Sequence, residues 1–200
     1  MTSKTIMISG IKNDVGRNIL FQSAVYWAEE GCKVLYIAKS KFDSIPSSGH
    51  GPQIPSSEVL AKIRIVYLEC MEELLKFVVD VLTFRDLTPR VMLVEELEEY
   101  SRESDHWLAR ACATLCHVAT CCATRLNLPT YLLVTVATTT DKLPPVICSM
   151  FDSMWCYNSE CNTVTRTLPV DLVPTAQMTL ASRSDGALVL REVSHLFVKH

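Results

Sequence analysis

The chain has 200 residues, of which 48% are hydrophobic and 20% are charged. This composition excludes a disordered chain, and the length fits one domain that buries about 70% of its extended surface. The net charge of −3 gives no general attraction to nucleic acid, so any DNA contact depends on a local patch. The apolar runs are too short to cross a bilayer, and we expect no membrane segment.

The nine cysteines are an odd number without a repeated C-x-x-C pair. In a reducing compartment such cysteines act most simply as small buried apolar residues. His117 lies among Cys112, Cys116, Cys121 and Cys122, but the spacing is that of a helix rather than of a zinc knuckle. We therefore expect no zinc in this chain, and no metal site among its residues.

Residues 4–18 read as an apolar strand, a loop between two glycines, and a helix that starts at Ile19. A phosphate-binding loop has this layout, because backbone N–H groups and the helix N-terminus hold the anion. The candidate nucleotide-binding residues are Gly10, Ile11, Lys12, Asn13, Asp14, Val15, Gly16, Arg17 and Asn18.

The loop departs from the pattern G-x-x-x-x-G-K-[ST] in several ways. Five residues separate Gly10 from Gly16, Arg17 replaces the lysine, and Asn18 replaces the hydroxyl residue that takes Mg²⁺. Asp14 adds a carboxylate to a loop meant for anions. Two interpretations stay open: weak binding of ATP with Mg²⁺, or a loop that is purely structural.

Further along the chain, strands and helices alternate. A helix after the loop presents Leu20 and Ala24 on one face, and residues 34–37 form the next strand. Residues 44–57 carry prolines, glycines and serines and predict a flexible loop. Residues 63–67 predict a third strand, which a second helical pattern follows.

Residues 91–94 form an unbroken apolar run, as expected for a strand of a parallel sheet that is buried on both faces. The run ends at Glu95, and ligand chemistry in such sheets gathers at the carboxyl ends of strands. Glu95 is therefore the candidate catalytic carboxylate, because a carboxylate at this edge can hold Mg²⁺. The alternative is an acidic corner that caps the following helix.

A long helix covers residues 103–126, and another buried strand covers 131–137. Residues 151–157 predict a strand. A hairpin follows, in which Asp185-Gly186 separates two alternating runs. The fold class is therefore α/β, with a mainly parallel sheet, helices on both faces and a C-terminal antiparallel hairpin.

This order resembles the RecA-like P-loop ATPase core. Four segments carry a closer resemblance: KIRIVYLECMEELLKFV, VMLVEELEEY, MFDSMWCYN and SRSDGALVL. They are similar to the SWIM-zinc-finger-associated recombinase paralogue of the Shu complex. The similarity covers nearly the whole chain and implies a single RecA-like domain over residues 1–200.

The resemblance implies a nuclear protein that acts in homologous recombination and double-strand break repair. It implies a partner with a SWIM zinc finger, a RecA-like recombinase whose filaments it supports, and single-stranded DNA. The zinc of the SWIM finger belongs to that partner. DNA-stimulated ATPase activity is attributed to the family.

Two departures argue against rapid hydrolysis. RecA-like ATPases carry a catalytic glutamate after the second strand, but this chain has IAKS at residues 37–40 there. They also carry a polar sensor residue after a later strand, at the place where this chain has Ala137. We therefore expect an interaction subunit. The rivals are a DNA-stimulated ATPase in which Arg17 and Glu95 substitute for the usual pair and, more distantly, a small-molecule kinase.

Overall fold

The computed structural model describes residues 2–11, 14–43, 46, 55–83, 87–100, 105–167, 174–182 and 188–195. These residues form one nine-stranded sheet with the order β3-β2-β4-β5-β1-β6-β7-β8-β9. The strands are β1 (Ser3–Ser9), β2 (Val34–Ala38), β3 (Ile63–Tyr67), β4 (Val91–Val94), β5 (Thr130–Thr135), β6 (Ser153–Asn158), β7 (Thr163–Thr167), β8 (Pro174–Ser182) and β9 (Leu188–His195).

The six strands from β3 to β6 in the sheet order are parallel to one another, and β7, β8 and β9 continue the sheet in antiparallel fashion. The predicted α/β class and mainly parallel sheet are confirmed. The predicted hairpin corresponds to β8 and β9, whose turn lies outside the described residues. Strand β7 was not predicted, so the antiparallel part is larger than a hairpin.

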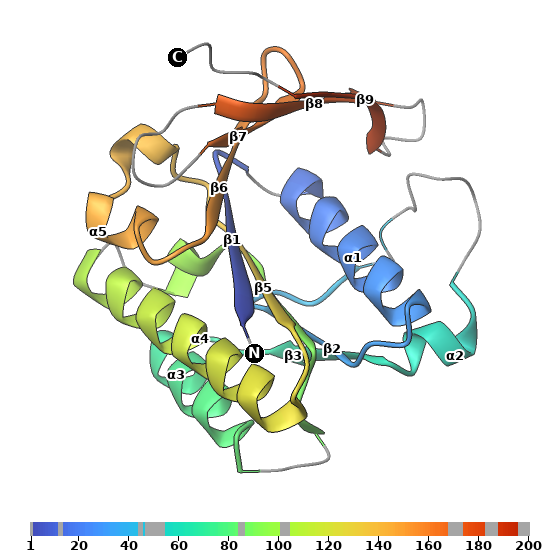
Figure 1. Cartoon of the computed structure of the whole chain (residues 1–200), viewed down its shortest axis with the longest axis vertical. Coiled ribbons are helices and arrows are strands. Elements are labelled where there is room, and N and C mark those ends of the chain that lie inside the picture. Colours follow the sequence, from blue (N-terminus) through green and yellow to red (C-terminus); the bar gives the residue numbers. More distant parts are fainter. Residues whose placement is uncertain are drawn as a thin grey trace.

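Helices lie on both faces of the parallel strands, as predicted. Figure 1 shows α1 (Asp14–Glu29) on one face, and α3 (Met71–Asp80) beside α4 (Asp105–Leu126) on the other. The short helices are α2 (Ser57–Leu60) and α5 (Pro145–Cys148), and the 3-10 turns are η2 (Leu97–Tyr100) and η3 (Thr140–Lys142). None of the helices in the described ranges is long and apolar enough to cross a membrane.

The two faces of the sheet bury separate cores. On the α3–α4 face, the predicted apolar stripe of α4 is buried against β1, β4 and β5. On the α1 face, Leu20, Phe21 and Ala24 pack against β2 and β4. A smaller third cluster gathers around Ile11 and Tyr157, below the loop that follows β1.

Several predicted boundaries were wrong. Strand β5 ends at Thr135 rather than at residue 137, and β6 begins at Ser153 rather than at residue 151. Helix α1 begins at Asp14 rather than Ile19, so Gly16, Arg17 and Asn18 belong to the helix. The serine-rich segment 44–57 was predicted as loop to its end, but Ser56 caps α2 by accepting the Val59 N–H, and Ser57 is helical. Most of that segment, residues 44–45 and 47–54, lies outside the described residues.

Candidate nucleotide site at the carboxyl edge of the sheet

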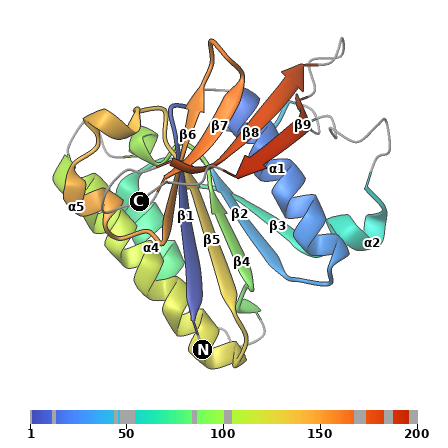
Figure 2. The ribbon, with the colours of Figure 1, turned by 45° about the horizontal axis from the view of Figure 1, so that its top comes forward.

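The strand order brings the two predicted site regions together. Strands β1 and β4 flank β5, and all three run in the same direction. Their carboxyl ends therefore meet at one edge of the sheet, where Gly10 follows β1 and Glu95 follows β4. Figure 2 shows this edge as the end of the parallel strands from which β1 continues into α1.

Arg17 and Glu95 bind each other across this edge. The Arg17 Nε donates to Glu95 Oε1 over 2.8 Å, and its Nη2 lies 2.7 Å from the same oxygen. The Glu95 side chain is only 3% exposed, and that of Arg17 is 20% exposed. The cation at the predicted lysine position of the loop and the predicted catalytic carboxylate therefore neutralise one another.

Three further side chains, which the sequence did not single out, complete this arrangement. The Tyr36 hydroxyl donates to Glu95 Oε2 over 2.9 Å, Arg17 Nη2 donates to Ser40 Oγ over 2.7 Å, and the guanidinium lies 5.1 Å from the centre of the Phe42 ring. Tyr36 could have been found from the sequence, because it carries the only side-chain hydroxyl in the apolar strand VLYIA. A buried tyrosine hydroxyl normally has a hydrogen-bond partner.

The electrostatics agree with a permanent pair. Burial alone would lower the pKa of Arg17, but the hydrogen bond and charge of Glu95 outweigh burial and raise it. Burial raises the pKa of Tyr36 well above its ordinary value, and the nearby Glu95 carboxylate adds to the increase. Arg17 therefore stays charged and Tyr36 stays protonated as a hydrogen-bond donor throughout the neutral range.

Both glycines of the loop have a packing role. Gly10 has φ +76°, a region that favours glycine, and a Cβ there would lie 2.7 Å from the carbonyl oxygen of Tyr157. A Cβ on Gly16 would lie 2.6 Å from Cγ2 of the fully buried Ile11. The glycine spacing that suggested a phosphate loop is thus explained by the contacts of the loop with the protein itself.

The backbone of the loop is tied to the segment after β5. The Gly10 N–H donates to the Thr138 carbonyl over 3.1 Å, and the Ile11 N–H donates to the Val136 carbonyl over 3.2 Å. The Ala137 N–H donates to the half-buried Glu98 carboxylate. The segment at the predicted sensor position is therefore held between Glu98 and the loop.

The described part of the loop offers little of what a phosphate ligand requires. A phosphate site needs free loop N–H groups and a cation directed at the anion, but Gly10, Ile11 and Arg17 are all bonded within the protein. Lys12 and Asn13 lie outside the described residues, and nothing is described for the side chain of Asp14. Val15 packs on the cluster around Ile11, and Asn18 is half-buried on α1.

The cysteines of α4 are spread over its faces rather than gathered. Cys112 and Cys122 are fully buried, and burial raises the pKa of Cys116 to about 11 and that of Cys122 to about 11. Thiols with such pKa values stay protonated at neutral pH, the form that binds metals poorly. Within the described ranges, no group of three or more His, Cys, Asp and Glu side chains is placed to hold a metal ion.

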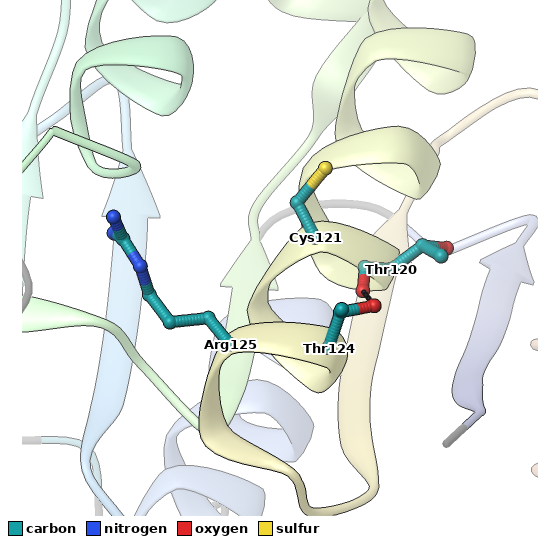
Figure 3. A pocket seen from close by; sticks show the side chains of 4 residues that line it. All are labelled: Thr120, Cys121, Thr124 and Arg125. Atoms are coloured by element: carbon teal, nitrogen blue, oxygen red, sulfur yellow. Dashed lines mark hydrogen bonds between the residues drawn. The ribbon is translucent and has the colours of Figure 1, made fainter.

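A shallow, open cavity of about 480 Å³ lies on α4, lined by Thr120, Cys121, Thr124 and Arg125 (Figure 3). Cys121 Sγ is 3.5 Å from Nε2 of His117, and Arg125 donates to the Leu82 carbonyl. The cavity belongs to one side of one helix, and none of its residues is among those that line the strand-end site.

In comparisons with known proteins, no family model matches the chain, and none of the curated proteins matches it significantly.

Proposed function

We propose that the chain is a RecA-fold interaction subunit of a Shu-type complex in homologous recombination. In this proposal it is a nuclear protein that binds a SWIM zinc-finger partner and single-stranded DNA, and it supports filaments of a RecA-like recombinase. The family-like segments described above suggest the role. The observation that carries its non-enzymatic part is the pairing of Arg17 with Glu95.

This pairing favours a subunit that works without nucleotide. In a nucleotide enzyme, the cation and the carboxylate would face a phosphate group and its metal ion. Here the carboxylate is nearly fully buried and is bonded to both Arg17 and Tyr36. The pair provides internally the charge balance that a nucleotide and Mg²⁺ would otherwise bring to this edge of the sheet.

Copurification tests the partner. The chain and a SWIM-finger protein are coexpressed with a tag on one of them, and the expected result is a stable complex that survives size-exclusion chromatography. An unrelated zinc-finger protein, coexpressed in the same way, is the control. If the SWIM-finger protein is soluble but elutes separately, the proposal loses its main support.

A second candidate function is a DNA-stimulated ATPase with a variant site. One observation favours it: the fold brings Arg17 and Glu95, which lie far apart in sequence, to within 2.7 Å of each other at the edge where such a site forms. A turnover above about one per minute in the presence of DNA, abolished by Arg17→Ala, would select this candidate over the first.

A further inference from the structure

The segment that follows β2, residues 39–43, leaves the sheet at the same carboxyl edge as the residue after β4, because the two strands are parallel neighbours. It belongs to neither a helix nor a strand, and four of its five residues are exposed, whereas Phe42 is half-buried. Such a segment has no helix or sheet hydrogen bonds of its own, so its position depends on side-chain contacts. Ala38, the last residue of β2, is fully buried and fixes the point at which the segment begins.

Arg17 of α1 contacts this segment at two points. Its Nη2 donates to Ser40 Oγ over 2.7 Å, and its guanidinium lies 5.1 Å from the centre of the Phe42 ring. The same guanidinium bonds Glu95 Oε1 through Nε at 2.8 Å and Nη2 at 2.7 Å. One side chain therefore joins the segment after β2 to the residue after β4. A lysine could not make all three contacts at once, because its ammonium is a compact charge without a planar fork or a stacking face.

Phe42 and Lys39 also anchor the segment. The Phe42 ring packs edge-on against Tyr36 and Tyr67, with ring centres 5.4 and 6.3 Å apart, and its N–H donates to the Tyr67 hydroxyl over 3.4 Å. Lys39 Nζ donates to the Glu99 carbonyl over 2.7 Å, but the Lys39 and Glu99 side chains are 43% and 57% exposed. Exposed ionic contacts contribute little to stability. The segment therefore depends on one aromatic side chain and on the cation that stacks on it.

We propose that residues 39–43 form a strap that opens and closes against the carboxyl edge of the sheet as one unit, and that Arg17 is the positioning residue that keeps it closed. In the closed state, Phe42 covers one face of the guanidinium and Ser40 takes one of its donors. In the open state, Arg17 stays on Glu95 alone, and its other face and donors become accessible. The inference concerns the chain itself and is tested on the free protein, so it stands or fails independently of the proposed function.

Limited digestion with trypsin reports the opening of the strap. Trypsin cleaves after lysine and arginine, and the strap contains Lys39 and Lys41, after which the next such residue is Lys62. Cleavage of a folded protein requires a local opening, and when reclosing is fast the rate follows the population of the open form. Mass spectrometry of the fragments identifies the cleavage after Lys41 and measures its rate. A synthetic peptide with the sequence of the strap gives the rate for an unstructured chain.

Two substitutions separate the strap from overall stability. Arg17→Ala removes the guanidinium, whereas Arg17→Lys keeps a cation beside Glu95 but loses the fork and the stacking face. Arg110→Ala is the matched control, because Arg110 of α4 stacks on the Trp107 ring at 5.2 Å on the opposite face of the sheet (Figure 1). Circular dichroism establishes that each variant is folded, and digestion is carried out well below the thermal midpoint of each, so that global unfolding does not contribute.

We expect cleavage after Lys41 to become at least about tenfold faster in Arg17→Ala and in Arg17→Lys, and to stay at the wild-type rate in Arg110→Ala. If Arg17→Ala does not fold, Arg17→Lys decides alone, because it keeps the charge of the pair. Cleavage of a folded Arg17 variant at the wild-type rate, or an equal increase in Arg110→Ala, would overturn the proposal. Cleavage of the wild type as fast as the free peptide would overturn it too, since the strap would then not be closed.

Discussion

At the scale of single residues, the Arg17–Glu95 pair has a large expected effect on stability. Glu95 is nearly fully buried, and its two oxygens are bonded to Arg17 and Tyr36. A buried carboxylate that loses its cation keeps the desolvation cost without the compensating attraction. Removal of one partner alone is therefore expected to lower the free energy of unfolding more than replacement of both partners together.

We predict that Arg17→Ala lowers the free energy of unfolding by about 3 kcal/mol, the low end of the range for broken buried pairs, because Arg17 keeps some exposure. Glu95→Gln lowers it as well, and the double variant loses less than the sum of the two. Urea unfolding of all four proteins measures the coupling. Additive losses would mean that the pair contributes no interaction energy.

Glu98 gives a pH-dependent prediction. Burial raises the pKa of this carboxyl, although N–H groups of Glu98, Ala137 and Thr138 partly oppose the increase. A raised folded-state pKa means that the contribution of Glu98 to stability is complete below the unfolded value near 4.5 and is lost as pH rises through the folded value.

The stability of Glu98→Gln relative to wild type should therefore increase from pH 4.5 upward and then level off above the folded pKa. Thermal unfolding of both proteins across this range measures the difference, and Glu99→Gln, an exposed neighbour on the same turn, is the control. A difference that stays constant with pH, or that decreases, would contradict this placement of Glu98.

At the scale of elements, the start of α1 depends on the contact between Gly16 and Ile11. Alanine normally stabilises a helix by up to about 1 kcal/mol relative to glycine. At position 16, however, the added Cβ would meet Cγ2 of a buried β-branched side chain at 2.6 Å. The contact cannot relax by a simple rotation, so the usual gain becomes a loss.

We predict that Gly16→Ala destabilises the protein by about 1–3 kcal/mol, the usual cost of overpacking. The added change Ile11→Leu, which removes the Cγ2 branch, should recover part of the loss. Denaturant midpoints of the single and double variants provide the test. A stabilised Gly16→Ala variant would show that Gly16 is not required for packing.

The elements also show what the sequence predicts well. The apolar runs 63–67 and 91–94 and the stripe of α4 were predicted because periodicity reports burial directly. Strand β7 was missed because it is short and mostly polar, with the sequence TVTRT. Its pairing with β6 and β8, rather than an apolar pattern, defines it as a strand. The start of α1 was misplaced because glycines are typical of loops. Gly16 instead lies in the helix, where it leaves room for the side chain of Ile11.

The candidate site was predictable in its location but not in its state. Glu95 and the loop that begins at Gly10 were each predicted to follow a strand of a parallel sheet, and such strands bring their carboxyl ends to one edge. No pattern in one dimension tells whether Arg17 faces a ligand or Glu95, because that depends on side-chain directions at the sheet edge. Ser40 and Phe42 escaped notice for the same reason.

At the scale of the whole molecule, the sheet has two surfaces that the described residues close to different degrees. The carboxyl edge of the parallel strands carries the closed network around Glu95, and the α1 face carries an apolar cavity beside α1. In the proposed function, the internal pairing of Arg17 with Glu95 suits a subunit that binds partners rather than one that turns over nucleotide. This pairing is the central feature of the proposal.

The most direct test is a titration of fluorescent ATP with Mg²⁺ into the purified protein, with and without single-stranded DNA. The wild type, Arg17→Ala and Glu95→Gln are compared, and each is checked for folding. We expect no saturable binding to the wild type up to about 1 mM nucleotide, and more binding to Glu95→Gln, which releases Arg17 from its partner. Saturable binding to the wild type that Arg17→Ala abolishes would contradict the account.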